Sequence, residues 1–174
     1  MASVKPLPRL SFVLGGARSG KSAHAEAVVQ SLPAPWIYVA TAQAFDSEME
    51  ARIYEHRARR PEGWITRDAP LALPEALREG PAGAPILVDC LTLWVTNLIL
   101  AERDVVAAGA ALEAACHDAP GPVVLVSNEV GLGIVPDNAL ARRFRDDAGR
   151  LHQRLAAAAD SVTFMVAGLP MTVK

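Results

Sequence analysis

The chain carries the apolar run Leu10-Ser11-Phe12-Val13-Leu14, followed at once by Gly15-Gly16-Ala17-Arg18-Ser19-Gly20-Lys21-Ser22. The second stretch matches the pattern G-x-x-x-x-G-K-[ST], and the helix-compatible residues 23–30 follow it. Glycines let such a loop wrap a phosphate with backbone N–H groups, and the N-terminus of the next helix adds a favourable dipole. A chance match in a glycine-rich turn is the alternative, but both neighbours that the motif requires are present. We therefore expect a nucleoside triphosphate site, with Lys21 on the β- and γ-phosphates and Ser22 on Mg²⁺.

The composition is that of one folded domain. The chain has 174 residues, of which 51% are hydrophobic and 21% charged, and its formal net charge is -2. We expect a single nucleotide-binding catalytic domain over residues 1–174, without nucleic acid or a membrane surface as a main partner. Cys90 and Cys116 form no C-x-x-C pair, and the N-terminal residues contain no long apolar run. These features predict a cytoplasmic protein with reduced cysteines.

Short apolar runs rich in β-branched residues alternate with stretches of helical character. The expected strands are 10–14, 36–40, 86–90, 123–127 and 162–167. The expected helices are 23–30, 47–60, 91–102, 105–117 and 138–159. This alternation after a P-loop predicts an α/β protein, a P-loop NTPase-like three-layer α/β/α fold with a mostly parallel central sheet.

Polar residues that follow these strands are candidate ligands, because parallel sheets bind ligands at the carboxyl ends of their strands. Asp89 ends an apolar run as a Walker-B acid does, and the alternative is a simple cap of the next helix. Because a P-loop is present, we interpret Asp89 as part of an Mg²⁺ site with Ser22. Asn128 and Glu129 also follow a strand and precede a glycine-rich stretch, but spacing alone favours an ordinary loop.

A basic segment around a single histidine is the most unusual part of the chain. If residues 47–60 form a helix, Arg52, His56 and Arg59 share one face. That face could hold phosphate oxygens while an imidazole faces the same pocket. A solvated basic face, with His56 only bordering the core, is the plainer interpretation and the one that spacing favours. His117 and His152 lie on Ala-, Leu- and Arg-rich helices, where surface positions are expected.

Taken together, the motifs resemble the bifunctional adenosylcobinamide kinase / adenosylcobinamide-phosphate guanylyltransferase family of cobalamin biosynthesis. The resemblance covers nearly the whole chain. Besides the P-loop it rests on Ala40-Thr41-Ala42, on Asp46-x-Glu48-Met49-x-Ala51-Arg52-Ile53-x-x-His56, and on Val126-x-Asn128-Glu129-Val130-Gly131-x-Gly133-Ile134-Val135-Pro136. It also includes Ala141-Arg142-x-Phe144-Arg145-Asp146-x-Ala148-Gly149-Arg150-x-x-Gln153-Arg154-Leu155-Ala156.

The resemblance implies a catalytic role for His56, because the family carries a covalent GMP-histidine intermediate on this segment. A neutral imidazole nitrogen would attack the α-phosphorus of GTP and release pyrophosphate, and the phosphate of the cobinamide substrate would then attack the phosphoramidate. The resemblance also implies transfer of a phosphoryl group from ATP or GTP to the aminopropanol hydroxyl of adenosylcobinamide, with Lys21, Ser22, Mg²⁺ and Asp89 neutralising charge.

Further nucleotide contacts are implied by the same resemblance. They are Ala40, Thr41, Ala42, Arg57, Ala58, Arg59, Arg60, Asp68 and Asp89. Asp68 is the weakest of them, because its surroundings, residues 64–68, appear as a loop with little fixed pattern. The chain has no N-K-x-D guanine motif, so a GTP preference rests on the resemblance, as does the expectation of a homotrimer.

Other classes of protein fit parts of this pattern. Another small-molecule P-loop kinase would transfer phosphoryl groups without a covalent intermediate, and a relative with only the guanylyltransferase step is a further alternative. A nucleotide-dependent switch would need a segment that senses the γ-phosphate. Asp89-Cys90-Leu91-Thr92 stands where a D-x-x-G motif would be expected, which disfavours the switch.

Overall fold

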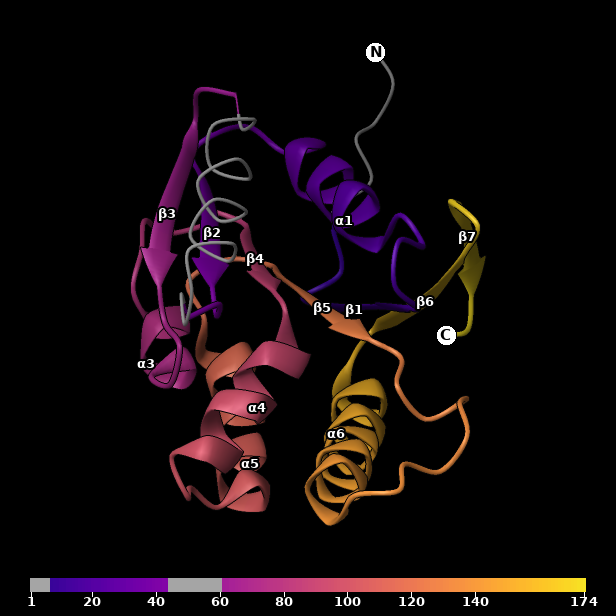
Figure 1. The fold of residues 1–174 in the computed structure, drawn as a ribbon. Helices are drawn as coiled ribbons and strands as arrows, with labels where there is room; N and C mark the ends of the chain where they lie inside the picture. The colour runs from indigo at the N-terminus through magenta and orange to yellow at the C-terminus, as the bar shows by residue number, and fades with distance from the viewer. Residues whose placement is uncertain (1–6, 44–60) are drawn as a thin grey trace.

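The computed structural model describes residues 7–43 and 61–174. Its described residues form a seven-stranded sheet with the order β3-β2-β4-β5-β1-β6-β7 (Figure 1). The strands are β1 Leu10–Gly15, β2 Trp36–Ala40, β3 Trp64–Asp68, β4 Ile86–Asp89, β5 Val123–Asn128, β6 Ser161–Val166 and β7 Leu169–Thr172. All neighbouring strands pair parallel except β6 and β7, which are antiparallel. The mostly parallel sheet is as the sequence predicts.

Helices cover both faces of this sheet. They are α1 Lys21–Gln30, α3 Leu73–Arg78, α4 Leu91–Leu100, α5 Val105–Asp118 and α6 Ala139–Ala158. Figure 1 shows α1 on one side of the sheet and α3, α4, α5 and α6 on the opposite side. Successive residues of one strand accordingly enter different cores: Phe12 packs with the α3–α6 layer, and Val13 packs with α1. The fold is therefore a three-layer α/β/α arrangement.

Local sequence explains where these elements form. In β4, Ile86, Leu87 and Val88 are all buried, as expected for a central parallel strand with helices on both faces. The Asp104 carboxylate accepts hydrogen bonds from the backbone N–H groups of Val106 and Ala107 and so begins α5. Asn138 caps α6 in the same way, through the N–H of Ala141.

The structure contains two strands, β3 and β7, and a short helix, α3, that the sequence pattern does not predict. Residues 64–68, expected as a loop, form β3, where the Trp64 ring packs 5.5 Å from Trp36 and 6.0 Å from Tyr38. The strand expected at 162–167 ends at Val166, because residues 167–168 turn the chain into β7 with positive φ angles of 50° and 81°. Pro170 is tolerated in β7 because β7 is an edge strand. The short helix α3 was not expected, and the helix expected at 47–60 lies outside the described residues.

Cys90 and Cys116 are both free thiols, and both are buried.

Within residues 7–43 and 61–174, no helix combines the length and apolar character needed to cross a bilayer.

Candidate functional site

The P-loop connects the carboxyl end of β1 to the first turn of α1. Gly20 occupies the N-cap position of α1 with φ +90°, a left-handed conformation that favours glycine. Lys21 begins the helix and is buried, and its Nζ donates a 3.2 Å hydrogen bond to the carbonyl of Gly16. The ammonium group is thus held inside the loop. Ser22 follows, half-buried, on the first turn of the helix.

Ser19 places an unpaired hydroxyl inside this loop. Ser19 is 7% exposed, and its Oγ has no hydrogen-bond partner among the described residues. The hydroxyl lies directly over Gly15, where a Cβ would collide with it. A buried polar atom without a partner costs about 1–3 kcal/mol, so such atoms in native proteins call for an explanation such as an unseen ligand. A phosphate oxygen in the loop would supply the missing partner.

The end of β5 lies directly beside the P-loop. Asn128 is in register with Gly15, and the backbone N–H of Glu129 donates a 3.0 Å hydrogen bond to the Gly15 carbonyl. The Asn128 amide also donates to the Thr92 hydroxyl at 2.9 Å. Spacing alone favours an ordinary loop at Asn128 and Glu129, whereas the structure places both residues beside the P-loop. In the sequence, only their position after a strand marks them as candidate site residues. That position places them beside the P-loop because β5 is the neighbour of β1.

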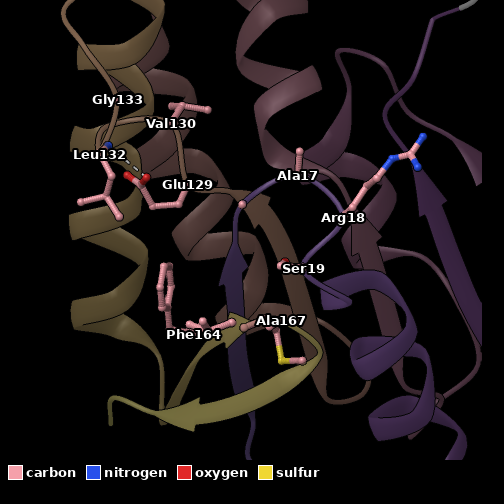
Figure 2. Close-up of a pocket in the computed structure, with 12 residues that line it drawn as sticks. Ala17, Arg18, Ser19, Glu129, Val130, Leu132, Gly133, Phe164 and Ala167 are labelled. Carbon is pink, nitrogen blue, oxygen red and sulfur yellow. Dashed lines mark hydrogen bonds between the residues drawn. The ribbon is translucent and has the colours of Figure 1, made fainter.

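A cavity of about 710 Å³ opens beside the P-loop (Figure 2). Its walls come from residues 16–19 of the P-loop, from the loop between Glu129 and Gly133, and from residues 164–167 at the turn of the β6–β7 hairpin. We call it the hairpin cavity. In Figure 2 the Phe164 ring stands toward Glu129 and Leu132, and the Arg18 side chain points the other way.

A second group of expected site residues lies at the opposite side of β5. Ala40 of β2 is in register with Asp68 of β3 on one side and with Asp89 of β4 on the other. Asp68 is exposed and Asp89 half-buried. The two carboxylates therefore follow the same edge of the sheet, one on each side of β2. We call these three residues and the adjoining Thr41 the carboxylate edge.

Thr41 is a structural anchor of this edge. It is fully buried, its Oγ1 donates a 2.6 Å hydrogen bond to the Cys90 carbonyl, and it accepts a 3.0 Å bond from the Cys90 N–H. The Asn97 amide donates to the Thr41 carbonyl at 2.8 Å and to the Pro70 carbonyl at 2.9 Å. Because the Thr41 hydroxyl is used twice by the protein, the residue shapes the edge chiefly through its backbone. Ala42 follows it, half-buried.

The expected Mg²⁺ residues are not on neighbouring strands. β5 lies between β1, which leads to Ser22, and β4, which ends at Asp89. Two strand spacings correspond to roughly 10 Å, a separation that suits an acid acting through water molecules better than direct coordination of one ion by both side chains. Within the described parts of the chain, no cluster of three or more His, Cys, Asp and Glu residues has the arrangement of a metal site. Mg²⁺ commonly keeps several waters and binds through one or two protein groups and substrate phosphates, so the pair Ser22 and Asp89 is compatible with it.

His152 differs from the surface position expected for it. It is half-buried on α6, where its Nε2 lies 2.7 Å from the Ser127 Oγ and its ring packs 5.6 Å from Phe12. Burial lowers the pKa of His152 to about 4, although the Glu129 carboxylate acts in the opposite direction. The imidazole is therefore neutral at pH 7. It packs against the carboxyl-terminal half of β5 and against β1. His117, by contrast, is exposed as expected.

The remaining expected site residues, His56, Arg57, Ala58, Arg59 and Arg60, lie outside the described residues. The described part brings the others into two groups, the P-loop with the β5 end and the carboxylate edge. Both groups lie at the carboxyl ends of parallel strands, where ligands bind in such sheets.

A profile of the family described as cobinamide kinase / cobinamide phosphate guanyltransferase matches residues 11–173. The chain belongs to this family. It is 53% identical over 166 residues to the bifunctional adenosylcobalamin biosynthesis protein CobP of Pseudomonas aeruginosa, covering 94% of this chain and 96% of the relative. It is 46% identical over 179 residues to the bifunctional adenosylcobalamin biosynthesis protein CobU of Salmonella typhimurium, covering 94% of this chain and 98% of the relative. The family resemblance stated from the motifs is thus confirmed.

Solved structures support the fold. A prototypical ATPase of the type III secretion system of pathogenic bacteria aligns with a TM-score of 0.56 at 12% identity, covering 94% of this chain and 56% of that chain. The flagellar accessory protein FlaH from Methanocaldococcus jannaschii aligns with a TM-score of 0.55 at 12% identity, covering 97% of this chain and 79% of that chain. At such identities the likeness shows the fold alone, which is that of P-loop NTPases.

Proposed function

We propose that this protein phosphorylates adenosylcobinamide and then converts the product to adenosylcobinamide-GDP. Membership of the cobinamide kinase / cobinamide phosphate guanyltransferase family over residues 11–173 is the observation that carries the proposal. We further propose that the protein is cytoplasmic, as its cysteines and N-terminal composition predict, and that it acts as a homotrimer, as the family resemblance implies.

The first step is phosphoryl transfer from ATP or GTP. The aminopropanol hydroxyl oxygen attacks the γ-phosphorus, the bond from that phosphorus to the β–γ bridging oxygen breaks, and the hydroxyl proton is lost to water. Catalysis of this reaction depends mainly on positioning and charge neutralisation. The buried Lys21 and the Ser19 hydroxyl, which has no hydrogen-bond partner among the described residues, support such a role for the P-loop. Ser22 and Asp89 would hold Mg²⁺, which supplies further neutralisation of phosphate charge when bound.

The second step is guanylyl transfer through His56. An imidazole nitrogen attacks the α-phosphorus of GTP, the bond to the α–β bridging oxygen breaks, and pyrophosphate leaves. A phosphate oxygen of adenosylcobinamide phosphate then attacks the same phosphorus, and the N–P bond breaks to regenerate histidine. Cationic side chains stabilise the charge that develops at phosphorus, and Arg52, Arg57, Arg59 and Arg60 are the candidates. Ala40, Thr41, Ala42, Ala58, Asp68 and Asp89 complete the proposed nucleotide contacts.

Product analysis tests both steps. The protein is incubated with adenosylcobinamide, Mg²⁺ and ATP, GTP is added next, and the corrinoid products are identified by mass spectrometry. We expect the phosphate ester first and adenosylcobinamide-GDP after GTP, with His56→Ala stopping at the ester and Lys21→Ala blocked before it. If wild-type protein also stops at the ester, the alternative of a small-molecule P-loop kinase without a covalent intermediate takes over. If His56→Ala completes the sequence, the covalent route is wrong.

A further inference from the structure

The walls of the hairpin cavity are joined to the P-loop by hydrogen bonds. The N–H of Gly168 donates a 2.9 Å hydrogen bond to the Ser19 carbonyl, which attaches the hairpin to the P-loop. The opposite wall is held by Glu129, whose carboxylate accepts hydrogen bonds from the N–H groups of Gly131 at 2.7 Å and Leu132 at 3.1 Å. The Glu129 backbone is in turn bonded to Gly15. Its walls are thus joined to the P-loop, so the cavity is formed in advance of any ligand.

The chemistry of the walls changes across the cavity. One end consists of the P-loop, with its backbone N–H groups and the buried Ser19 hydroxyl, for which the described part of the chain supplies no partner. The other end is apolar, with the half-buried Phe164 ring and the side chains of Leu132 and Met165. A ligand that fits both ends carries phosphate at one end and a flat, weakly polar ring at the other. A purine nucleotide has this composition, and a base can stack on an aromatic ring.

The carboxylate edge lies on the other side of the P-loop. β1 has β6 on one side and β5, β4, β2 and β3 on the other. A triphosphate held in the P-loop can therefore direct its base toward the hairpin cavity or toward the carboxylate edge, but not toward both. In both orientations the phosphates would lie in the same loop. The base would lie in the hairpin cavity in one orientation and at the carboxylate edge in the other.

The two places offer different kinds of base recognition. Guanine carries N–H donors on its pairing edge, and a carboxylate such as that of Asp68 is an acceptor that suits them. In the hairpin cavity, the carboxylate found among the described lining residues is that of Glu129, and its two oxygens already accept backbone N–H groups. Recognition there depends on shape and stacking, which every purine satisfies.

We propose that the hairpin cavity holds the base and ribose of the nucleoside triphosphate that gives up its γ-phosphoryl group, whereas the guanine of the GTP that gives up GMP lies at the carboxylate edge. The assignment rests on the two-step function proposed above. It makes one P-loop serve two nucleotide orientations, one for each reaction, and it makes Phe164 a binding residue for the phosphoryl donor alone.

Substitution of Phe164 tests this assignment. Phe164→Ala removes the ring, and Phe164→Leu keeps apolar volume while losing the flat stacking surface. Met171→Ala is the matched control, because Met171 is the cross-strand partner of Phe164 in β7 and does not line the cavity. We expect the KM for ATP in phosphoryl transfer to rise about tenfold in Phe164→Ala, from the usual effect of losing one base–aromatic stack, and to rise to a smaller extent in Phe164→Leu. kcat at saturating ATP stays unchanged, and so does the GTP concentration that half-saturates GMP labelling of the protein.

Calorimetric binding of ATP to the same variants separates this proposal from the function on which it rests. If wild-type protein binds ATP, Phe164→Leu binds it more weakly and no GMP is ever attached, the hairpin cavity holds the base of ATP, and the two-step function fails together with the guanine position that depends on it. If ATP binds all three variants as tightly as wild type, the assignment is overturned whatever the activities are. Equal loss of phosphoryl transfer and GMP labelling in Phe164→Leu also overturns it, because the base would then occupy one place in both reactions. Thermal unfolding shows which variants are folded, and Phe164→Leu retains the test if Phe164→Ala does not fold.

Discussion

The carbonyl of Ser19 accepts a hydrogen bond from the backbone N–H of Gly168, so the turn of the C-terminal hairpin is attached to the P-loop immediately before α1. Gly20 lies at this junction with φ +90°, and a Cβ on it would lie 3.2 Å from the Cα of Gly168. The junction therefore requires glycine at position 20 for two reasons, its left-handed backbone and the close approach of the hairpin. The β6–β7 hairpin is consequently in direct contact with the P-loop, although it is remote from the motif in sequence.

Gly20→Ala should therefore destabilise the protein and weaken ATP binding. We expect the free energy of unfolding to fall by about 1–3 kcal/mol, the usual cost of a strained backbone position, in urea unfolding. Gly149→Ala is the matched control, because Gly149 lies within α6 and, apart from its chain neighbours and the nearby backbone of its own helix, no described atom is within 4 Å of the added Cβ. It should raise the free energy of unfolding by up to about 1 kcal/mol through helix propensity. Similar changes in both variants would contradict this account of the junction.

Stability should fall on mild acidification because of His152. Its pKa is lowered from 6.5 to about 4 in the folded protein, so the unfolded chain binds more protons between these values. Stability from this group is fully present above pH 6.5 and is lost as pH falls toward 4, by about 2 kcal/mol between pH 7 and pH 5. Urea unfolding at both pH values measures the loss. In His152→Gln the loss should shrink by this amount, and the exposed His117→Gln should retain it; the reverse pattern would refute the assignment.

The Asn97 side chain should be essential for the stability of the carboxylate edge. Asn97 is buried and donates hydrogen bonds to the carbonyls of Thr41 and Pro70. Asn97→Ala leaves both carbonyls without this donor, so we expect the free energy of unfolding to fall by about 2–4 kcal/mol. Thr96→Ala is the control, because the Thr96 hydroxyl donates to the Thr92 carbonyl within the same helix, and its loss should cost less than about 1 kcal/mol. An equal cost for the two variants would show that the bonds to Thr41 and Pro70 contribute nothing.

The two carboxylates beside Ala40 should differ in their effects. Asp89→Asn should raise the Mg²⁺ concentration needed for both phosphoryl transfer and GMP attachment, because an amide is a weaker ligand for a hard cation. Asp68→Asn should leave the Mg²⁺ dependence unchanged and raise the GTP concentration that half-saturates GMP attachment by about tenfold, the effect of losing one charged hydrogen bond. Magnesium and GTP titrations of both variants measure this. If the two variants behave alike, separate roles for the carboxylates are ruled out.

Much of the fold could be predicted because its signals are local. The apolar runs of β1, β2, β4 and β5 and the glycine-rich loop after β1 each identify themselves within a few residues. β3 escaped prediction because its stability comes from packing of Trp64 against Trp36 and Tyr38, which are distant in sequence. β7 escaped because Pro170 argues against a strand unless the strand is known to be at an edge.

In the candidate site, the P-loop residues could be predicted from the sequence, whereas the surroundings of Asn128, Phe164 and His152 could not. The P-loop motif fixes Lys21 and Ser22 by spacing, so these positions needed no tertiary information. The position of Asn128 beside the P-loop and the role proposed for Phe164 depend on which strands flank β1, and strand order is a property of the whole fold. The burial of His152 likewise depends on the packing of α6 against β1 and β5.

The most direct test of the account is whether GMP becomes attached to His56. Wild-type protein and His56→Ala are incubated with Mg²⁺ and GTP labelled at the α- or the γ-phosphate, denatured, and assayed for label on the protein. We expect that only α-label is retained, that the linkage is acid-labile and alkali-stable, and that His56→Ala retains none. Tight GTP binding without retained α-label, or equal labelling of His56→Ala, would contradict it.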